Sequence, residues 1–85
     1  MPFDFSVDHD RHCVTVTARD PLSVDDVLAV IDRQAAQAWT YPVIHDARAT
    51  AWTPNAGEVV RVLSYIRNTS RRLGVARGPV AFVTS

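Results

Sequence analysis

The sequence predicts one α/β domain, on the border with α+β, with the element order ββαβαβ and a mixed four-stranded sheet. Two alternating runs near the start of the chain predict a β-hairpin. Two amphipathic stretches with helix start signals follow, and each precedes a short apolar run rich in β-branched residues. Because a strand after a crossover helix usually lies parallel to the strand before that helix, two such units extend the hairpin into one sheet.

The hairpin is predicted at residues 3–8 and 13–19. Both runs alternate strictly between apolar and polar side chains, which is typical of strands with one buried face. The polar residues 9–12 lie between these runs and predict the turn of the hairpin.

The first helix is predicted to begin after Ser23, whose hydroxyl suits the N-cap position, and to end at about Ala38. Asp25 and Asp26 in the first turn suit the positive end of the helix dipole. An apolar stripe at helical spacing indicates which face of the helix is buried. The stripe comprises Val24, Val27, Leu28, Ile31, Ala35 and Trp39.

Residues 41–48, YPVIHDAR, form the predicted central strand. Val43 and Ile44 place β-branched side chains on both faces of the pleat, which predicts a strand covered on both sides. Asp46 and Arg48 follow at the carboxyl end of the strand, where binding sites gather in open α/β sheets. We expect Asp46 to accept N–H bonds from the following loop or to pair with an arginine such as Arg48.

The second helix is predicted to begin with Thr53 as its cap and Pro54 at the first helical position, and to end at Gly74. Its arginines predict a solvated face rather than a nucleic-acid site, because the whole chain has no net charge. Residues 79–85 predict a final parallel strand, buried on both faces. The apolar stripe of the second helix comprises Val59, Val62, Leu63, Ile66 and Leu73.

The composition excludes several classes of protein. The 85 residues are 47% hydrophobic, which fits a single globular domain over residues 1–85. No apolar run reaches the roughly 20 residues that a membrane span needs. The first residues lack the character of a signal peptide, and the single Cys13 cannot form an internal disulfide. A cytoplasmic location is therefore expected.

The distribution of charge and the uncovered sheet surfaces of this topology indicate how the chain could associate with a partner or with a second copy. Residues 1–47 carry a net charge of −5 and residues 48–85 a net charge of +5. The asymmetry fits head-to-tail association or an anionic partner, and it also fits ordinary solvated helix faces. With both helices on one side, one face of the sheet would stay bare and the final strand would present an unpaired edge. We therefore expect a homodimer that buries at least ~1,000 Å².

Several stretches carry a resemblance to a known class. They are the alternating hairpin, SVDDVLAVID, YPVIHDAR, and TPNAGEVVRVLSYIRNTSRRLG before RGPVAFV. Together they resemble the small bacterial SpoIIAA-like proteins of the STAS class (sulphate transporter and anti-sigma factor antagonist). Members usually continue with a further strand and helix, so the resemblance implies a STAS-like domain shortened at its C-terminus. The Asp-Ser-Ser-Gly signature at which the anti-sigma antagonists are phosphorylated is absent, and RATAWTP stands in its place.

Two clusters of titratable residues predict neither catalysis nor metal binding. Residues 8–13 contain two aspartates, two histidines and Cys13, but their spacing fits no standard zinc pattern. His45 and Asp46 are neighbours, yet neighbours on a strand point to opposite faces and cannot act as an acid–base pair. The sequence thus predicts no catalytic residue, no metal and no cofactor.

The predicted function is that of a non-catalytic regulatory module that docks a protein partner. The expected interaction surface is the loop after the central strand with the start of the second helix, namely Asp46, Arg48, Thr50, Trp52 and Thr53. The alternative is a binder of a small apolar or lipid-like ligand, held between the sheet and its helices. Its candidate lining residues are Trp39, Tyr41 and Trp52, which bracket the central strand.

Overall fold

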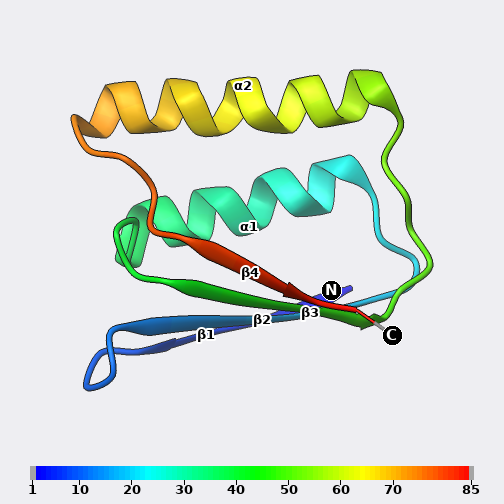
Figure 1. The fold of residues 1–85 in the computed structure, drawn as a ribbon, viewed down its shortest axis with the longest axis horizontal. Helices are drawn as coiled ribbons and strands as arrows, with labels where there is room; N and C mark the ends of the chain where they lie inside the picture. The colour runs from blue at the N-terminus through cyan, green and yellow to red at the C-terminus, as the bar shows by residue number, and fades with distance from the viewer. Residues whose placement is uncertain (1, 85) are drawn as a thin grey trace.

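The computed structural model describes residues 2–84, and it confirms the predicted ββαβαβ order (Figure 1). Two strands come first, and each of the two helices is then followed by one further strand, as the hydrophobic periodicity predicts. Their bounds are β1 Phe3–Asp8, β2 Cys13–Arg19, α1 Val24–Gln37, β3 Val43–Ala49, α2 Ala56–Leu73 and β4 Val80–Val83.

The four strands form one mixed sheet in the order β1-β2-β3-β4. β1 and β2 pair antiparallel as a hairpin, whereas β3 and β4 each add in parallel after a helix. The register aligns one row of valines across the sheet, in which Val14 pairs with Val7 and Val43, and Val43 pairs with Val80. β4 is therefore the short outer strand on the parallel side of the sheet.

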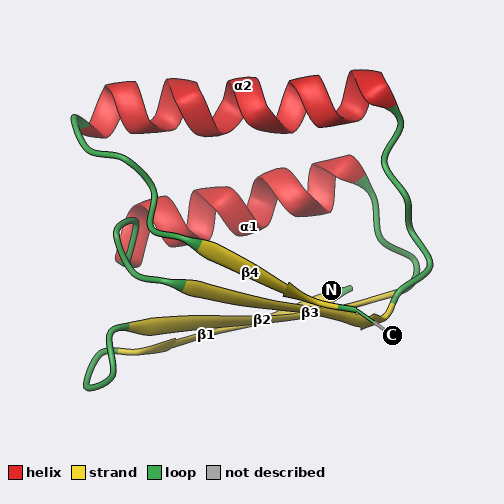
Figure 2. Cartoon of the chain, viewed as in Figure 1, coloured by secondary structure: helices red, strands yellow, loops and turns green. Residues whose placement is uncertain are grey.

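Both helices lie on the same face of the sheet, as Figure 2 shows. Val43 points to that face and is 1% exposed, whereas its neighbour Ile44 points to the opposite face and is 42% exposed. The prediction that the central strand is covered on both sides is therefore wrong. The prediction of one bare face is confirmed, because neither crossover places a helix there.

The core consists of two clusters that meet at α1. The first joins the inner face of the sheet to α1 and comprises Phe3, Val14, Val16, Val30, Ala38 and Val43. The second lies between α1 and α2, where Leu28, Ile31 and Trp39 contact Val62, Tyr65 and Ile66. α1 thus forms the middle layer, and α2 packs on α1 as the outer element.

The start of α1 confirms the predicted N-cap. The backbone N–H of Asp26 donates to the hydroxyl of Ser23 at 3.3 Å, and the backbone N–H of Ser23 donates to the carboxylate of Asp26 at 2.9 Å. This reciprocal pair satisfies two of the N–H groups that a helix start leaves without intrahelical partners.

The start of α2 differs from the prediction. The N-cap is Asn55, not Thr53: its side chain accepts from the backbone N–H of Glu58 at 2.8 Å, and the Glu58 carboxylate accepts from the backbone N–H of Asn55 at 3.1 Å. The capping box stabilises a start at Ala56, so Thr53 and Pro54 remain in the loop. The predicted end of the helix is confirmed, because Gly74 caps it in the left-handed region at φ 74°.

The apolar stripe of α2 is less buried than its pattern predicts. Val59, Leu63 and Leu73 are 41%, 56% and 37% exposed, and Thr69 is the buried residue of this helix. The reason is geometric, since part of the stripe borders an open cavity instead of a packed core. In the described part of the chain, no helix is long and apolar enough to cross a membrane.

Candidate functional site: a cavity between the sheet and α2

A cavity of about 470 Å³ lies between the two helices and the parallel strands. Its volume falls within the range of about 300–1,000 Å³ that is usual for small-molecule sites. β3 and β4 contribute His45, Ala47, Val80 and Phe82 on the sheet side. The helices contribute mainly aliphatic side chains, among them Val30, Ile31, Val59, Val62, Leu63 and Ile66.

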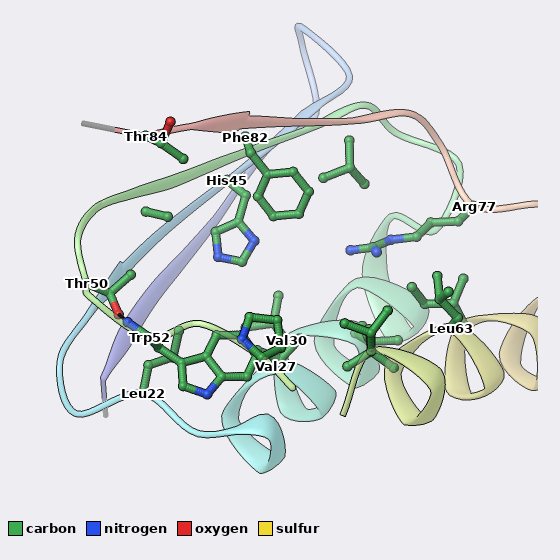
Figure 3. Close-up of a pocket in the computed structure, with 17 residues that line it drawn as sticks. Leu22, Val27, Val30, His45, Thr50, Trp52, Leu63, Arg77, Phe82 and Thr84 are labelled. Carbon is green, nitrogen blue, oxygen red and sulfur yellow. Dashed lines mark hydrogen bonds between the residues drawn. The ribbon is translucent and has the colours of Figure 1, made fainter. Parts of the chain in front are cut away.

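The two ends of the cavity differ in chemistry (Figure 3). Trp52 lies at one end with Leu22 and Thr50, which come from the loops that lead into the two helices. At the opposite end, the guanidinium of Arg77 points into the cavity from the segment between α2 and β4. The site therefore has an apolar body with a cation at one end.

Arg77 is held in place by two contacts. Its Nε donates a hydrogen bond to Oε1 of Gln34 at 2.6 Å, and its guanidinium lies 5.7 Å from the centroid of the Trp39 ring. Burial lowers the pKa of Arg77 from its usual value, although an arginine stays protonated in proteins. Among the described residues, no carboxylate pairs with it.

Gln34 is the polar residue that anchors this end of the site. Its side chain is fully buried, and its Nε2 donates to three backbone carbonyl oxygens within 3.4 Å. These carbonyls belong to Ala38, Trp39 and Tyr41, so the amide holds the whole turn between α1 and β3. Both ends of the carboxamide are used, which is what a buried amide requires.

The chain after α2 lies close against the same turn. The indole Nε1 of Trp39 donates to the carbonyl of Val75 at 3.1 Å, and the N–H of Gly78 donates to the carbonyl of Trp39 at 3.0 Å. A Cβ at residue 78 would collide with the carbonyl oxygens of Thr40 and Tyr41. Glycine is needed here for close backbone approach, and this approach fixes where its neighbour Arg77 stands.

His45 presents an imidazole to the cavity from β3. The ring stacks on Phe82 of β4, with the centroids 5.1 Å apart and the planes at 28°. Burial lowers the pKa of His45, the charge of Arg77 lowers it further, and Asp46 partly opposes both. Within residues 2–84, neither ring nitrogen of His45 has a hydrogen-bond partner, so this neutral ring can serve a ligand.

Asp46 and Arg48 lie outside the cavity. The Arg48 side chain donates to both carboxylate oxygens of Asp46, at 3.0 and 2.7 Å, and the backbone N–H of Arg48 donates at 3.1 Å. These bonds lower the pKa of Asp46 to about 2. The predicted pairing of Asp46 is confirmed, and alternation along β3 places this carboxylate on the face opposite His45.

The loop before α2 is tied to the residue that follows β2. The hydroxyl of Thr50 donates to the Asp20 carboxylate at 2.7 Å, and the N–H of Ala51 donates to it at 3.0 Å. The N–H of Trp52 in turn donates to the Thr50 hydroxyl at 3.1 Å. Trp52 is thereby placed at the cavity, while Thr53 is exposed. The five residues of the expected interaction surface are therefore not one surface. Thr50 and Trp52 line the cavity, Thr53 is exposed in the loop, and Asp46 and Arg48 lie on the outer side of the sheet.

Of the three candidate lining residues, Trp52 lines the cavity, whereas Trp39 and Tyr41 do not. Trp39 is 5% exposed and lies beneath Arg77. Tyr41 faces the hairpin turn, where its hydroxyl is 3.0 Å from Nδ1 of His9 and its ring meets the His12 ring edge to face. The described residues contain no group of three His, Cys, Asp or Glu side chains placed to share a metal ion.

Sequence reasoning did not select Gln34, His45 and Arg77 as a set. One signal was present, because Gln34 follows Val27, Val30 and Ile31 at helical spacing and so occupies a core position of α1. A polar residue in such a stripe needs buried partners. Nothing local in the sequence indicates that its partner is Arg77, 43 residues further along.

The arrangement can hold an elongated molecule that is largely apolar and carries one polar end. Comparison of the chain with known proteins finds no matching family model, no similar curated protein and no similar solved structure.

Proposed function

We propose that this protein binds a small, largely apolar molecule in the cavity between the sheet and α2, without catalysing its conversion. The observation that carries the proposal is the position of the α2 stripe. Val59, Val62 and Leu63 have the spacing of a buried helix face, yet they border a cavity of about 470 Å³. A ligand there would remove these side chains from water, at roughly 25 cal/mol for each Å² of apolar surface buried.

The cavity walls support ligand binding more than they support catalysis. They are almost entirely aliphatic and aromatic, and their polar groups are few and lie at defined positions, as in most small-molecule sites. His45 faces the cavity, but the described residues that line it include no cysteine, serine, aspartate or glutamate that could act with the imidazole. Of the two functions that the sequence predicts, the cavity therefore favours the binding of a small apolar ligand.

Octanol is a suitable first probe, because it is apolar, flexible and small enough for the cavity. We expect it to shift the amide NMR signals of residues around the cavity and to raise the thermal midpoint. At a ligand concentration of about 100 times Kd, the free energy of unfolding rises by about 2.7 kcal/mol. No shift with octanol, octanoate or octyl phosphate would contradict the proposal.

A variant that fills the cavity provides the control. Ala47 lines the cavity from β3, so Ala47→Phe should place an aromatic ring where the ligand would lie and abolish binding. Ala36 is exposed on α1, and Ala36→Phe should leave binding unchanged. Equal binding by both variants would place the ligand elsewhere on the protein.

A second candidate function is the predicted interaction module, with a second copy of the chain as the partner. The outer face of the sheet favours it, because Ile44 and Val83 are 42% and 37% exposed there, beside the paired Asp46 and Arg48. The opposite net charges of residues 1–47 and 48–85 make two copies complementary. In this proposal the predicted homodimer forms through the outer sheet face. The STAS-like classification and the cytoplasmic location remain predictions.

A further inference from the structure

Arg77 differs from the arginines that the described chain pairs with carboxylates. Arg11, Arg48 and Arg61 form ion pairs with aspartates at the surface. Arg77 is partly buried at the end of an apolar cavity, and within residues 2–84 its hydrogen-bond acceptor is the neutral amide of Gln34. A cation that is partly removed from water without a counter-charge is costly, so an anion at this point would be stabilised.

The contacts of Arg77 leave the terminal part of its guanidinium available. Nε is engaged by Gln34, and the hydrogen bonds of the described residues do not use the two terminal nitrogens. The guanidinium points into the cavity (Figure 3). Two parallel N–H groups in one plane match the two oxygens of a carboxylate.

We infer that the ligand is an apolar molecule with a terminal carboxylate, which the terminal nitrogens of Arg77 bind while the apolar body extends towards Trp52. This inference rests on the proposed function and names its ligand class. The direction follows from the two ends of the cavity, since Arg77 lies at one end and Trp52 and Leu22 at the other.

The groups around the cavity favour a carboxylate over a phosphate. A phosphate has more charge and more acceptor oxygens than one guanidinium can satisfy. The cavity walls are mainly apolar, and Leu63 lies beside Arg77 (Figure 3), so they would leave those oxygens without donors. His45 can add one N–H towards the cavity, and Asp46 is kept away on the other face by Arg48.

Matched eight-carbon ligands test the inference directly. Octanoate should bind more tightly than octanol by roughly ten- to a hundredfold at neutral pH, because a charge-assisted hydrogen bond is added to the same apolar contact. Octyl phosphate should bind more weakly than octanoate. Equal affinity for octanoate and octanol would overturn the carboxylate assignment while leaving the proposed function in place. Tighter binding of octyl phosphate would also overturn it. Failure of all three ligands to bind would overturn both.

Variants locate the effect at residue 77. Arg77→Gln should remove the preference for octanoate while leaving octanol affinity nearly unchanged, and Arg77→Lys should retain a smaller preference because it keeps the charge. Arg72→Gln, at an exposed position of α2, is the matched control and should keep the full preference. If Arg77→Gln does not fold, the preference for octanoate over octanol is compared between Arg77→Lys and the wild-type protein instead, and an undiminished preference in Arg77→Lys would contradict the inference. A full preference in a folded Arg77→Gln protein would contradict the inference.

Discussion

Nε of Arg77 donates a hydrogen bond to Oε1 of Gln34 across 43 residues of sequence, at 2.6 Å. The bond joins the segment before β4 to the last turns of α1. Gln34 in turn holds the carbonyls of the turn that leads into β3. One amide therefore fixes both the start of the parallel strands and the cation of the proposed site.

Replacement of Gln34 should destabilise the protein strongly. In Gln34→Leu, the carbonyl of Tyr41 loses its donor and Nε of Arg77 loses its acceptor, whereas the carbonyls of Ala38 and Trp39 each keep one backbone N–H donor. The expected loss in the free energy of unfolding is about 2–4 kcal/mol. Urea denaturation measures this loss. Gln37→Leu, at an exposed position of the same helix, is the matched control and should change stability by less than about 0.5 kcal/mol. Equal effects of the two substitutions would contradict the anchoring role.

The capping box at α2 predicts a contrast between two neighbouring polar residues. Asn55→Ala should cost about 1 kcal/mol of stability, because the N–H of Glu58 loses its acceptor. Thr53→Ala should cost less than about 0.5 kcal/mol, since Thr53 is exposed in the loop. The denaturation midpoints of the two variants measure these losses. A larger loss for Thr53→Ala than for Asn55→Ala would show that Thr53 is the N-cap.

His45 should make the stability depend on pH. Its pKa in the folded protein is lowered, mainly by burial and also by Arg77, so the folded state binds fewer protons than the unfolded state. The sign follows from linkage: stability is highest above the usual histidine pKa of about 6.5 and falls as the pH drops from there towards the folded-state pKa. The fall should be smaller in His45→Phe. Parallel pH–stability curves for the two proteins would show that His45 does not contribute.

The homodimer prediction can be tested at Ile44. Sedimentation equilibrium of the wild-type chain should give twice the monomer mass, and Ile44→Asp should dissociate the dimer by placing charge on the outer sheet face. Ile44→Asp should remain folded, because Ile44 is 42% exposed. Val60→Asp, on the exposed side of α2, is the control and should stay dimeric. A wild-type monomer at micromolar concentration would show the homodimer prediction to be wrong.

Local sequence signals were sufficient to predict the helices and strands and their order along the chain. Alternation defined the hairpin strands, and Ser23 and Gly74 marked helix ends that the structure confirms. The start of α2 was misplaced because Thr53 with Pro54 imitates a cap. Asn55 with Glu58 three residues later was the stronger signal, since it satisfies two backbone N–H groups instead of one.

Features that depend on contacts between residues far apart in the sequence were harder to predict. The pair Val43 and Ile44 predicts apolar side chains on both faces of a strand, but the placement of both helices on one face left Ile44 partly exposed. The cavity likewise depends on how α2 packs on α1. No local sequence pattern predicts how far this packing holds α2 from the sheet. Trp52 was selected because it follows the central strand, and it does line the cavity.

The outer position of α2 has a consequence for local opening. β2 lies between two strands, and its Val14 and Val16 are fully buried, so its amide hydrogens should exchange with solvent mainly through global unfolding. α2 rests on α1 along one side and has few buried residues, so it should detach at a lower free energy and exchange sooner. A ligand in the cavity would contact α2 and the sheet together, and its first effect should be slower exchange along this helix.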